Sequence, residues 1–181
     1  LYLNYRNHQK IIIIDSDTGY TGGMNLADEY ANYTSPFGYW KDTGVRLDGH
    51  GVYGLTVTFI NMWDQTAGKL SGSYSRYLPS RHVSEKGFCQ VFSDGPANNP
   101  LNPAEGLIYR MIESAAKYVY LTTPYLAVSQ PLIDTICRAA RSGVRVVLLV
   151  PYQLDHWYVF EVTQSHFPAL IGAGVEVYRY S

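Results

Sequence analysis

The stretch His-Gln-Lys-Ile-Ile-Ile-Ile-Asp, residues 8–15, decides the fold and the chemistry that we expect of this chain. Four consecutive isoleucines, Ile11–Ile14, predict a buried strand, because β-branched side chains pack well on a pleated sheet. Residues two apart on a strand point to the same side, so His8 and Lys10 are expected to present an imidazole and an ammonium together. Asp15 ends the strand and begins a turn rich in Asp, Ser and Gly.

The side chains at the start of this strand suit phosphoryl-group transfer. An imidazole can attack phosphorus or deliver a proton, and a lysine charge neutralises phosphoryl oxygens as negative charge builds in the transition state. A Gly-Gly-Met-Asn sequence, residues 22–25, follows Asp15 after six residues. It lacks the lysine and the serine or threonine of a nucleotide-binding phosphate loop, so nucleotide chemistry is not expected.

The spacing resembles the H-x-K-x4-D signature of the phospholipase D superfamily, with His8, Lys10 and Asp15 in its three positions. Much of that superfamily continues with Gly-Ser-x-Asn, whereas the Gly-Gly-Met-Asn form is similar to the bacterial cardiolipin synthase branch. Further segments resemble that branch along nearly the whole chain. They are Trp40-Lys41-Asp42-Thr43, Gln90-Val91, Ser93-Asp94-Gly95-Pro96, Thr123-Pro124-Tyr125, Gly143-Val144-Arg145-Val146, Pro151 with Asp155, and Ala173-Gly174-Val175-Glu176-Val177-Tyr178.

The resemblance implies roles for single residues of the motif. His8 is implied as the nucleophile or as the acid and base partner, two roles that one motif does not separate. Lys10 and Asn25 would grip the non-bridging phosphate oxygens, and Gly23, which replaces the serine, would leave backbone N–H donors for the phosphate. Asp15 completes the catalytic motif, either by orienting its neighbours electrostatically or as a plain turn residue. No metal and no cofactor is implied.

Asp155 is a candidate site residue outside the motif. It follows the predicted strand 144–150, at the carboxyl end of a parallel strand, which is the edge where open α/β sheets bind ligands. The alternative is a helix cap before Trp157. Cys89 and Cys137 fit neither a disulfide framework nor a metal site, and we expect both to be small buried hydrophobic residues.

Strands that alternate with helices in the second half of the chain predict an α/β fold with a largely parallel sheet covered on both faces. The resemblance implies parts of two similar phospholipase D-like lobes: 1–67 ends the first lobe, 68–87 is a linker, and 88–181 begins the second lobe and stops before its own motif. The expected strands are 11–14, 20–22, 43–47, 88–93, 118–122, 144–150 and 175–180. The expected helical segments are 26–30, 52–65, 104–114, 130–142 and 157–171.

Composition narrows the substrate class. The chain has 14 Lys and Arg against 15 Asp and Glu, and its pI is near 6.6, so it carries no general basic field that would gather nucleic acid. No apolar run approaches the ~18 residues that a transmembrane helix needs. We therefore expect this chain to be soluble, and the resemblance implies that segments outside it attach the parent protein to the bacterial cytoplasmic membrane.

The first functional hypothesis is part of a cardiolipin synthase-like transphosphatidylase that moves a phosphatidyl group between phosphatidylglycerol molecules through a phosphohistidine. The alternatives are a phosphodiesterase or nuclease of the same superfamily, and a non-catalytic module that binds phosphate. Because the superfamily builds one active site from two such motifs, the 181 residues alone are expected to be inactive as a monomer. A homodimer could instead bring two copies of His8 together.

Overall fold

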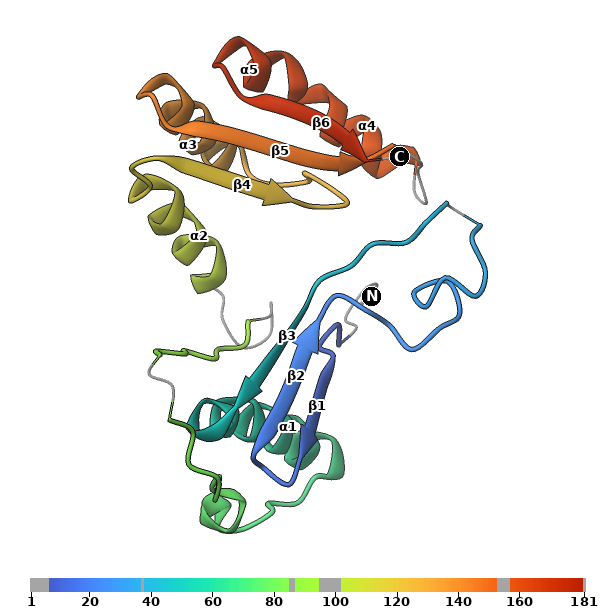
Figure 1. The fold of residues 1–181 in the computed structure, drawn as a ribbon, viewed down its shortest axis with the longest axis vertical. Helices are drawn as coiled ribbons and strands as arrows, with labels where there is room; N and C mark the ends of the chain where they lie inside the picture. The colour runs from blue at the N-terminus through green and yellow to red at the C-terminus, as the bar shows by residue number, and fades with distance from the viewer. Residues whose placement is uncertain (1–6, 37, 85–86, 95–101, 153–156, 181) are drawn as a thin grey trace. The chain divides into compact units, whose positions relative to one another are not determined.

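The computed structural model describes residues 7–36, 38–84, 87–94, 102–152 and 157–180 (Figure 1). The chain divides into two compact units. One consists of Leu1–Thr34 with Trp40–Ser93, and the other of Ser35–Tyr39 with Asp94–Ser181. The assignment of chain segments to two family lobes joined by a linker remains a prediction.

The first unit contains an antiparallel sheet of strand order β1-β2-β3, with a helix on one side of it (Figure 1). Its elements are β1 (Ile11–Ile14), β2 (Thr18–Gly22), β3 (Gly44–Asp48), the short 3-10 helices η1 (Gly49–Gly51) and η2 (Tyr74–Tyr77), and the helix α1 (Val52–Ala67). The helix contacts β1 and β2. A Cβ atom on Gly19 of β2 would lie 2.8 Å from the Leu55 side chain, so a glycine lets helix and sheet approach closely.

The four isoleucines of β1 are not buried together, and that expectation was wrong. Ile12 and Ile14 are 55% and 50% exposed, whereas Ile11 and Ile13 are half-buried. Side chains alternate between the two faces of a strand, and within the described residues of this unit α1 covers only one face. In addition, β1 is an edge strand, because β2 lies between it and β3.

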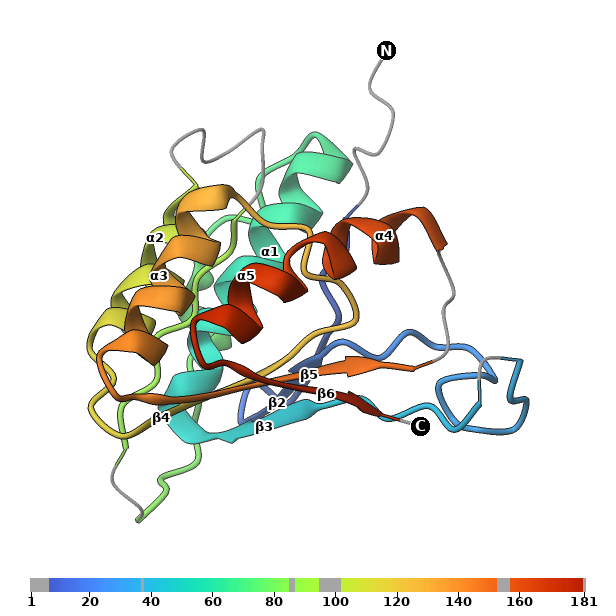
Figure 2. The ribbon, with the colours of Figure 1, turned by 90° about the horizontal axis from the view of Figure 1, so that it is seen from above.

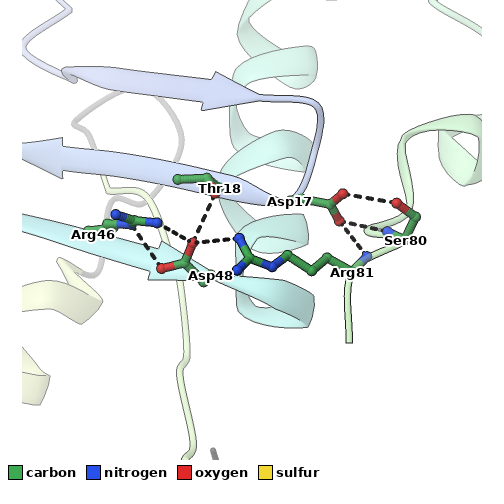
Figure 3. A network of polar contacts seen from close by, with 6 residues as sticks. All are labelled: Asp17, Thr18, Arg46, Asp48, Ser80 and Arg81. Carbon is green, nitrogen blue, oxygen red and sulfur yellow. Dashed lines mark hydrogen bonds and ion pairs between the residues drawn. The ribbon is translucent and has the colours of Figure 1, made fainter. Parts of the chain in front are cut away.

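The segment that follows α1 is bound to the first unit through Asp17, in the turn between β1 and β2 (Figure 3). The Asp17 carboxylate accepts hydrogen bonds from the Ser80 amide at 2.7 Å, the Ser80 hydroxyl at 2.9 Å and the Arg81 amide at 2.8 Å. These N–H and O–H donors hold the pKa of Asp17 below its usual value, with the Arg81 amide as the largest cause. Residues 68–84 therefore fold onto this unit.

A second carboxylate, Asp48 at the end of β3, joins three donors in the same region (Figure 3). Arg46 donates to both of its oxygens, at 2.9 and 3.0 Å, and the Thr18 hydroxyl donates at 2.9 Å. The Arg81 guanidinium lies 3.9 Å from Asp48 and completes the ion-pair network. The network fixes the end of the sheet opposite His8 and Lys10.

The predicted strand 88–93 is not a strand in the structure. The segment lies against α1 instead: a Cβ atom on Gly54 would be 2.8 Å from the Val91 side chain, and one on Gly51 would be 3.3 Å from Cys89. Phe88 is fully exposed. Cys89 is exposed as well, so the expectation that it is buried was wrong, whereas the burial of Cys137 is confirmed. An apolar composition alone does not form a strand, because a strand needs a partner with free hydrogen-bonding groups.

The second unit is a parallel sheet in the order β4-β5-β6 with helical connections, so its α/β class is confirmed. Its elements are α2 (Pro103–Glu113), β4 (Tyr118–Thr122), α3 (Gln130–Arg141), β5 (Arg145–Pro151), α4 (Trp157–Ser165), α5 (Phe167–Gly172) and β6 (Glu176–Tyr180). The helix predicted over 157–171 is broken at His166. Pro168, which lacks an N–H, lies in the first turn of the second piece.

The helices α2, α3 and α5 lie on one side of this sheet (Figure 2). The core between them and the strands includes Ile133, Leu148 and Leu170, each almost fully buried. The other face carries four exposed tyrosines: Tyr118, Tyr120, Tyr178 and Tyr180. Among the described residues of this unit, helices therefore cover one face of the sheet, not both faces as expected.

Candidate active site

His8 and Lys10 lie immediately before β1, not within it, because the strand begins at Ile11. His8 is exposed and Lys10 is half-buried. The Lys10 ammonium donates a hydrogen bond of 2.8 Å to the main-chain carbonyl of His8. The structure therefore brings the lysine charge to the residue that carries the imidazole, although the two residues precede the strand.

Asn7, the residue before His8, contacts α1 and so links the His8 segment to this helix. The Asn7 amide nitrogen contacts the sulfur of Met62 in α1, and the Asn7 side-chain oxygen accepts a hydrogen bond of 2.8 Å from the Gln9 amide. These contacts fix the main chain on both sides of His8. The sequence interpretation gave no role to Asn7 or Met62, because their contact joins positions 55 residues apart.

The strand register brings Lys10 next to the Gly-Gly-Met-Asn segment. Ile11 pairs with Thr21 across the β1–β2 hairpin, so Lys10, just before Ile11, and Gly22, just after Thr21, lie at the same end of the hairpin. Gly22 pairs in turn with Gly44 of β3. A Cβ atom on Gly22 would lie 2.6 Å from the Thr43 carbonyl oxygen, so glycine is needed for this close approach of strands.

Gly23 contacts the segment that returns into β3. Its amide donates to the Thr43 carbonyl at 3.4 Å, a long hydrogen bond, which occupies this N–H in the structure. A Cβ atom on Gly23 would clash with Oδ1 of Asp42, so the Asp42 carboxylate lies directly against this glycine. The use of the Gly23 amide for phosphate remains a prediction.

Asn25 begins a loop that is stabilised by contacts of side chains within the loop. Its amide donates 2.6 Å to the Tyr30 hydroxyl, and the Tyr30 ring lies 4.5 Å from the ring of Trp40. Asn32 binds both main-chain groups of Trp40, donating to its carbonyl at 2.9 Å and accepting from its amide at 2.6 Å. The predicted helical turn 26–30 is a hydrogen-bonded turn and not a helix.

Asp15 lies at the far end of β1 from His8 and Lys10. Both Asp15 and Ser16 have left-handed backbone angles, with φ of 53° and 60°, which is typical of a tight hairpin turn. Five residues of extended chain separate Asp15 from Lys10 by about 17 Å. Asp15 therefore has no part in the proposed mechanism.

Three further expectations concern Asp155, a metal ion and a membrane-spanning helix. Asp155 lies outside the described residues, so its role remains a prediction. Among the residues that the structure describes, no group of three or more His, Cys, Asp or Glu side chains could hold a metal ion. No helix in the described part of the chain is long and apolar enough to span a bilayer.

Comparison with known proteins identifies the family of the chain. The family described as "Cardiolipin synthase, PLD-like domain" matches residues 108–181. Proteins named cardiolipin synthase from Listeria monocytogenes and Staphylococcus aureus are 37% and 38% identical to the chain, over 98% and 99% of its length. A Streptococcus mutans protein without an assigned function is 36% identical over 99% of the chain.

The chain belongs to the phospholipase D superfamily. Within that superfamily it falls in the cardiolipin synthase branch, as the Gly-Gly-Met-Asn segment indicates. It spans a little over a third of the length of these relatives, 37% of the Listeria protein and 36% of the Staphylococcus protein.

Proposed function

We propose that His8 and Lys10 form half of the active site of a transphosphatidylase, which transfers the phosphatidyl group of one phosphatidylglycerol to another and releases glycerol. The observation that carries this proposal is the contact between the Lys10 ammonium and the His8 main chain, at the end of the hairpin where β2 leads into Gly23. The similarity to proteins named cardiolipin synthase supports the lipid substrate.

In the first step one imidazole nitrogen attacks the phosphorus of the donor lipid, and the P–O bond to glycerol breaks as the P–N bond forms. A second imidazole, supplied by another copy of the motif, donates a proton to the departing glycerol oxygen. Lys10 and the Asn25 amide offset the negative charge on the non-bridging oxygens. His8 is one of the two imidazoles.

In the second step a hydroxyl of the acceptor lipid attacks the phosphohistidine. The new O–P bond forms, the P–N bond breaks, and the hydroxyl proton passes to the imidazole that had acted as the acid. Water in place of the alcohol would give phosphatidic acid. Neither step needs a metal ion, because lysine and asparagine supply the charge and the donors.

Because the reaction needs a second imidazole, an active site must contain two copies of the motif. The 181 residues alone are expected to give no turnover as a monomer, because each histidine supplies a whole catalytic role. A homodimer with two His8 residues in one site is the other arrangement that satisfies the chemistry. The phospholipid substrate places the full-length protein at the bacterial cytoplasmic membrane.

The test is to supply the full-length protein with phosphatidylglycerol vesicles and, separately, with single- and double-stranded DNA. Lipid products are identified by mass spectrometry, and we expect cardiolipin and glycerol in equal amounts with the DNA intact. Cleavage of DNA without any lipid product would replace the lipid assignment by that of a nuclease.

A further inference from the structure

The Asp42 carboxylate occupies the space next to Gly23 in which a side chain would otherwise begin. A Cβ atom on Gly23 would clash with Oδ1 of Asp42 and lie 3.0 Å from both Cγ and Oδ2. A side chain at position 23 would therefore displace the Asp42 carboxylate from this position. Superfamily members with Gly-Ser-x-Asn have a hydroxyl donor at this position, whereas here a carboxylate lies beside it.

Asp42 is held in place by its own segment of the chain. Its Oδ1 accepts a hydrogen bond of 2.7 Å from the Thr43 amide, and its Oδ2 accepts a long one of 3.5 Å from the Trp40 indole. Trp40 is itself fixed by two hydrogen bonds with Asn32, one donated by the Asn32 amide and one by the Trp40 main-chain amide. The carboxylate is thus oriented before any ligand binds.

The same carboxylate retains hydrogen-bonding capacity. It is half-buried, and within the described residues it forms no ion pair with a lysine or arginine. Two carboxylate oxygens offer about four acceptor positions, of which the Thr43 and Trp40 donors use two. Positions therefore remain for donors from a ligand.

Asp42 also lies close to the proposed phosphate site. Lys10 precedes Ile11 and Gly22 follows Thr21, and Ile11 pairs with Thr21, so Lys10, Gly22 and Gly23 lie at the same end of the β1–β2 hairpin. With strands about 4.8 Å apart and successive Cα atoms about 3.8 Å apart, the carboxylate is on the order of 10 Å from the Lys10 main chain. That distance is comparable to the length of a glycerol phosphate group.

An ionised carboxylate accepts hydrogen bonds but does not donate them. It repels a phosphate and favours a ligand that offers O–H donors. We infer that Asp42 binds a hydroxyl of the acceptor alcohol, a polyol headgroup with neighbouring hydroxyls, and so favours transfer over hydrolysis. One hydroxyl binds Asp42 while its neighbour attacks phosphorus. This inference rests on the proposed transphosphatidylase function and assigns it a residue for acceptor specificity.

The test compares Asp42→Asn with the unchanged full-length protein on phosphatidylglycerol vesicles. Asparagine preserves the acceptor for the Thr43 amide but turns an NH₂ group toward the ligand. Total glycerol release measures the first step, and the ratio of cardiolipin to phosphatidic acid measures how the intermediate is divided between alcohol and water. We expect the product ratio to fall about tenfold or more, whatever the change in total glycerol release.

Two further variants test whether a change in the product ratio is specific to the Asp42 carboxylate. Asp42→Ser also removes the charge, and its hydroxyl can still accept from the Thr43 amide, so it should shift the ratio in the same direction even if one variant folds poorly. Asp134→Asn removes the same charge from an exposed position on α3 and should leave the ratio unchanged.

The results distinguish a failure of the Asp42 inference from a failure of the proposed transphosphatidylase function. An unchanged product ratio in both Asp42 variants, with glycerol release and cardiolipin falling together, would mean that Asp42 only supports the loop, and the inference would be wrong. No lipid turnover by the unchanged full-length protein would overturn the proposed function itself, and the acceptor role with it.

Discussion

The Lys10 ammonium donates a hydrogen bond of 2.8 Å to the main-chain carbonyl of His8. A carbonyl is a neutral acceptor, so this contact orients the lysine without cancelling its charge. Within the described residues Lys10 forms no ion pair. The charge therefore remains available for a phosphate group beside the imidazole.

The first prediction concerns this charge. Lys10→Met in the full-length protein should lower kcat/KM for phosphatidylglycerol about 100-fold or more, because a fixed cation at the developing charge contributes on that scale. Lys69→Met, at an exposed lysine just after α1, is the matched control and should leave the rate unchanged. A loss in Lys10→Met that is no larger than in the control would contradict the assigned role.

The second prediction concerns the fit of Gly23 against Asp42. Gly23→Ala should lower the free energy of unfolding by about 1 kcal/mol, because the added methyl group displaces the Asp42 carboxylate from the Thr43 amide and the Trp40 indole. In an Asp42→Ala background, where no carboxylate is left to displace, Gly23→Ala should cost much less, as measured by urea denaturation. Gly106→Ala in α2 is the control: its Cβ would meet nothing within 4 Å, and the change should be neutral or stabilising. Equal effects at the two glycines would refute the close contact.

The third prediction concerns Asp17, which binds Ser80 and Arg81 (Figure 3). Asp17→Ala should free this segment and speed tryptic cleavage after Arg81, whereas Asp134→Ala should not. The pKa of Asp17 is lowered in the folded protein, chiefly by the Arg81 amide. The stabilisation is therefore complete above the unfolded pKa of about 3.9 and is lost as the pH falls through the lower folded pKa. Cleavage rates that match the control would be inconsistent with this contact.

The fourth prediction concerns Glu176 in the second unit. Arg145 donates to both carboxylate oxygens, at 2.7 and 3.0 Å, and lowers the pKa of Glu176 to about 2. Its contribution to stability should be complete above about pH 4.5 and should disappear as the pH falls toward 2. Urea denaturation at several pH values should show a shallower acid dependence for Glu176→Gln. Parallel curves for the two proteins would argue against the pair.

Local sequence patterns predicted many of the elements. The isoleucine run gave β1 with the observed bounds, and the Tyr118–Thr122 strand was also predicted with its observed bounds. The errors occurred where tertiary context decides. Residues 88–93 have the composition of a strand but lie on α1, and Pro168 breaks a helix whose apolar pattern continues past it.

The candidate site was predictable only in part, for the same reason. The motif identified His8, Lys10 and Asn25 because their spacing lies within a short stretch of chain. The importance of Asp42 depends on the register between β2 and β3, which sets the residues that oppose Gly23. The segment 40–43, which contains Asp42, resembles the family. The spacing of its residues does not predict that a carboxylate lies against a glycine.

His8 is proposed to be one of the two imidazoles of a phosphatidyl-transfer site. The most direct test is cardiolipin formation from phosphatidylglycerol by the full-length protein and by its His8→Asn variant, with His50→Asn at an exposed histidine as the control. We expect His8→Asn to abolish measurable cardiolipin formation while keeping its thermal stability, and the His50 variant to match the unchanged protein. Cardiolipin formation by His8→Asn at the rate of the unchanged protein would contradict the account.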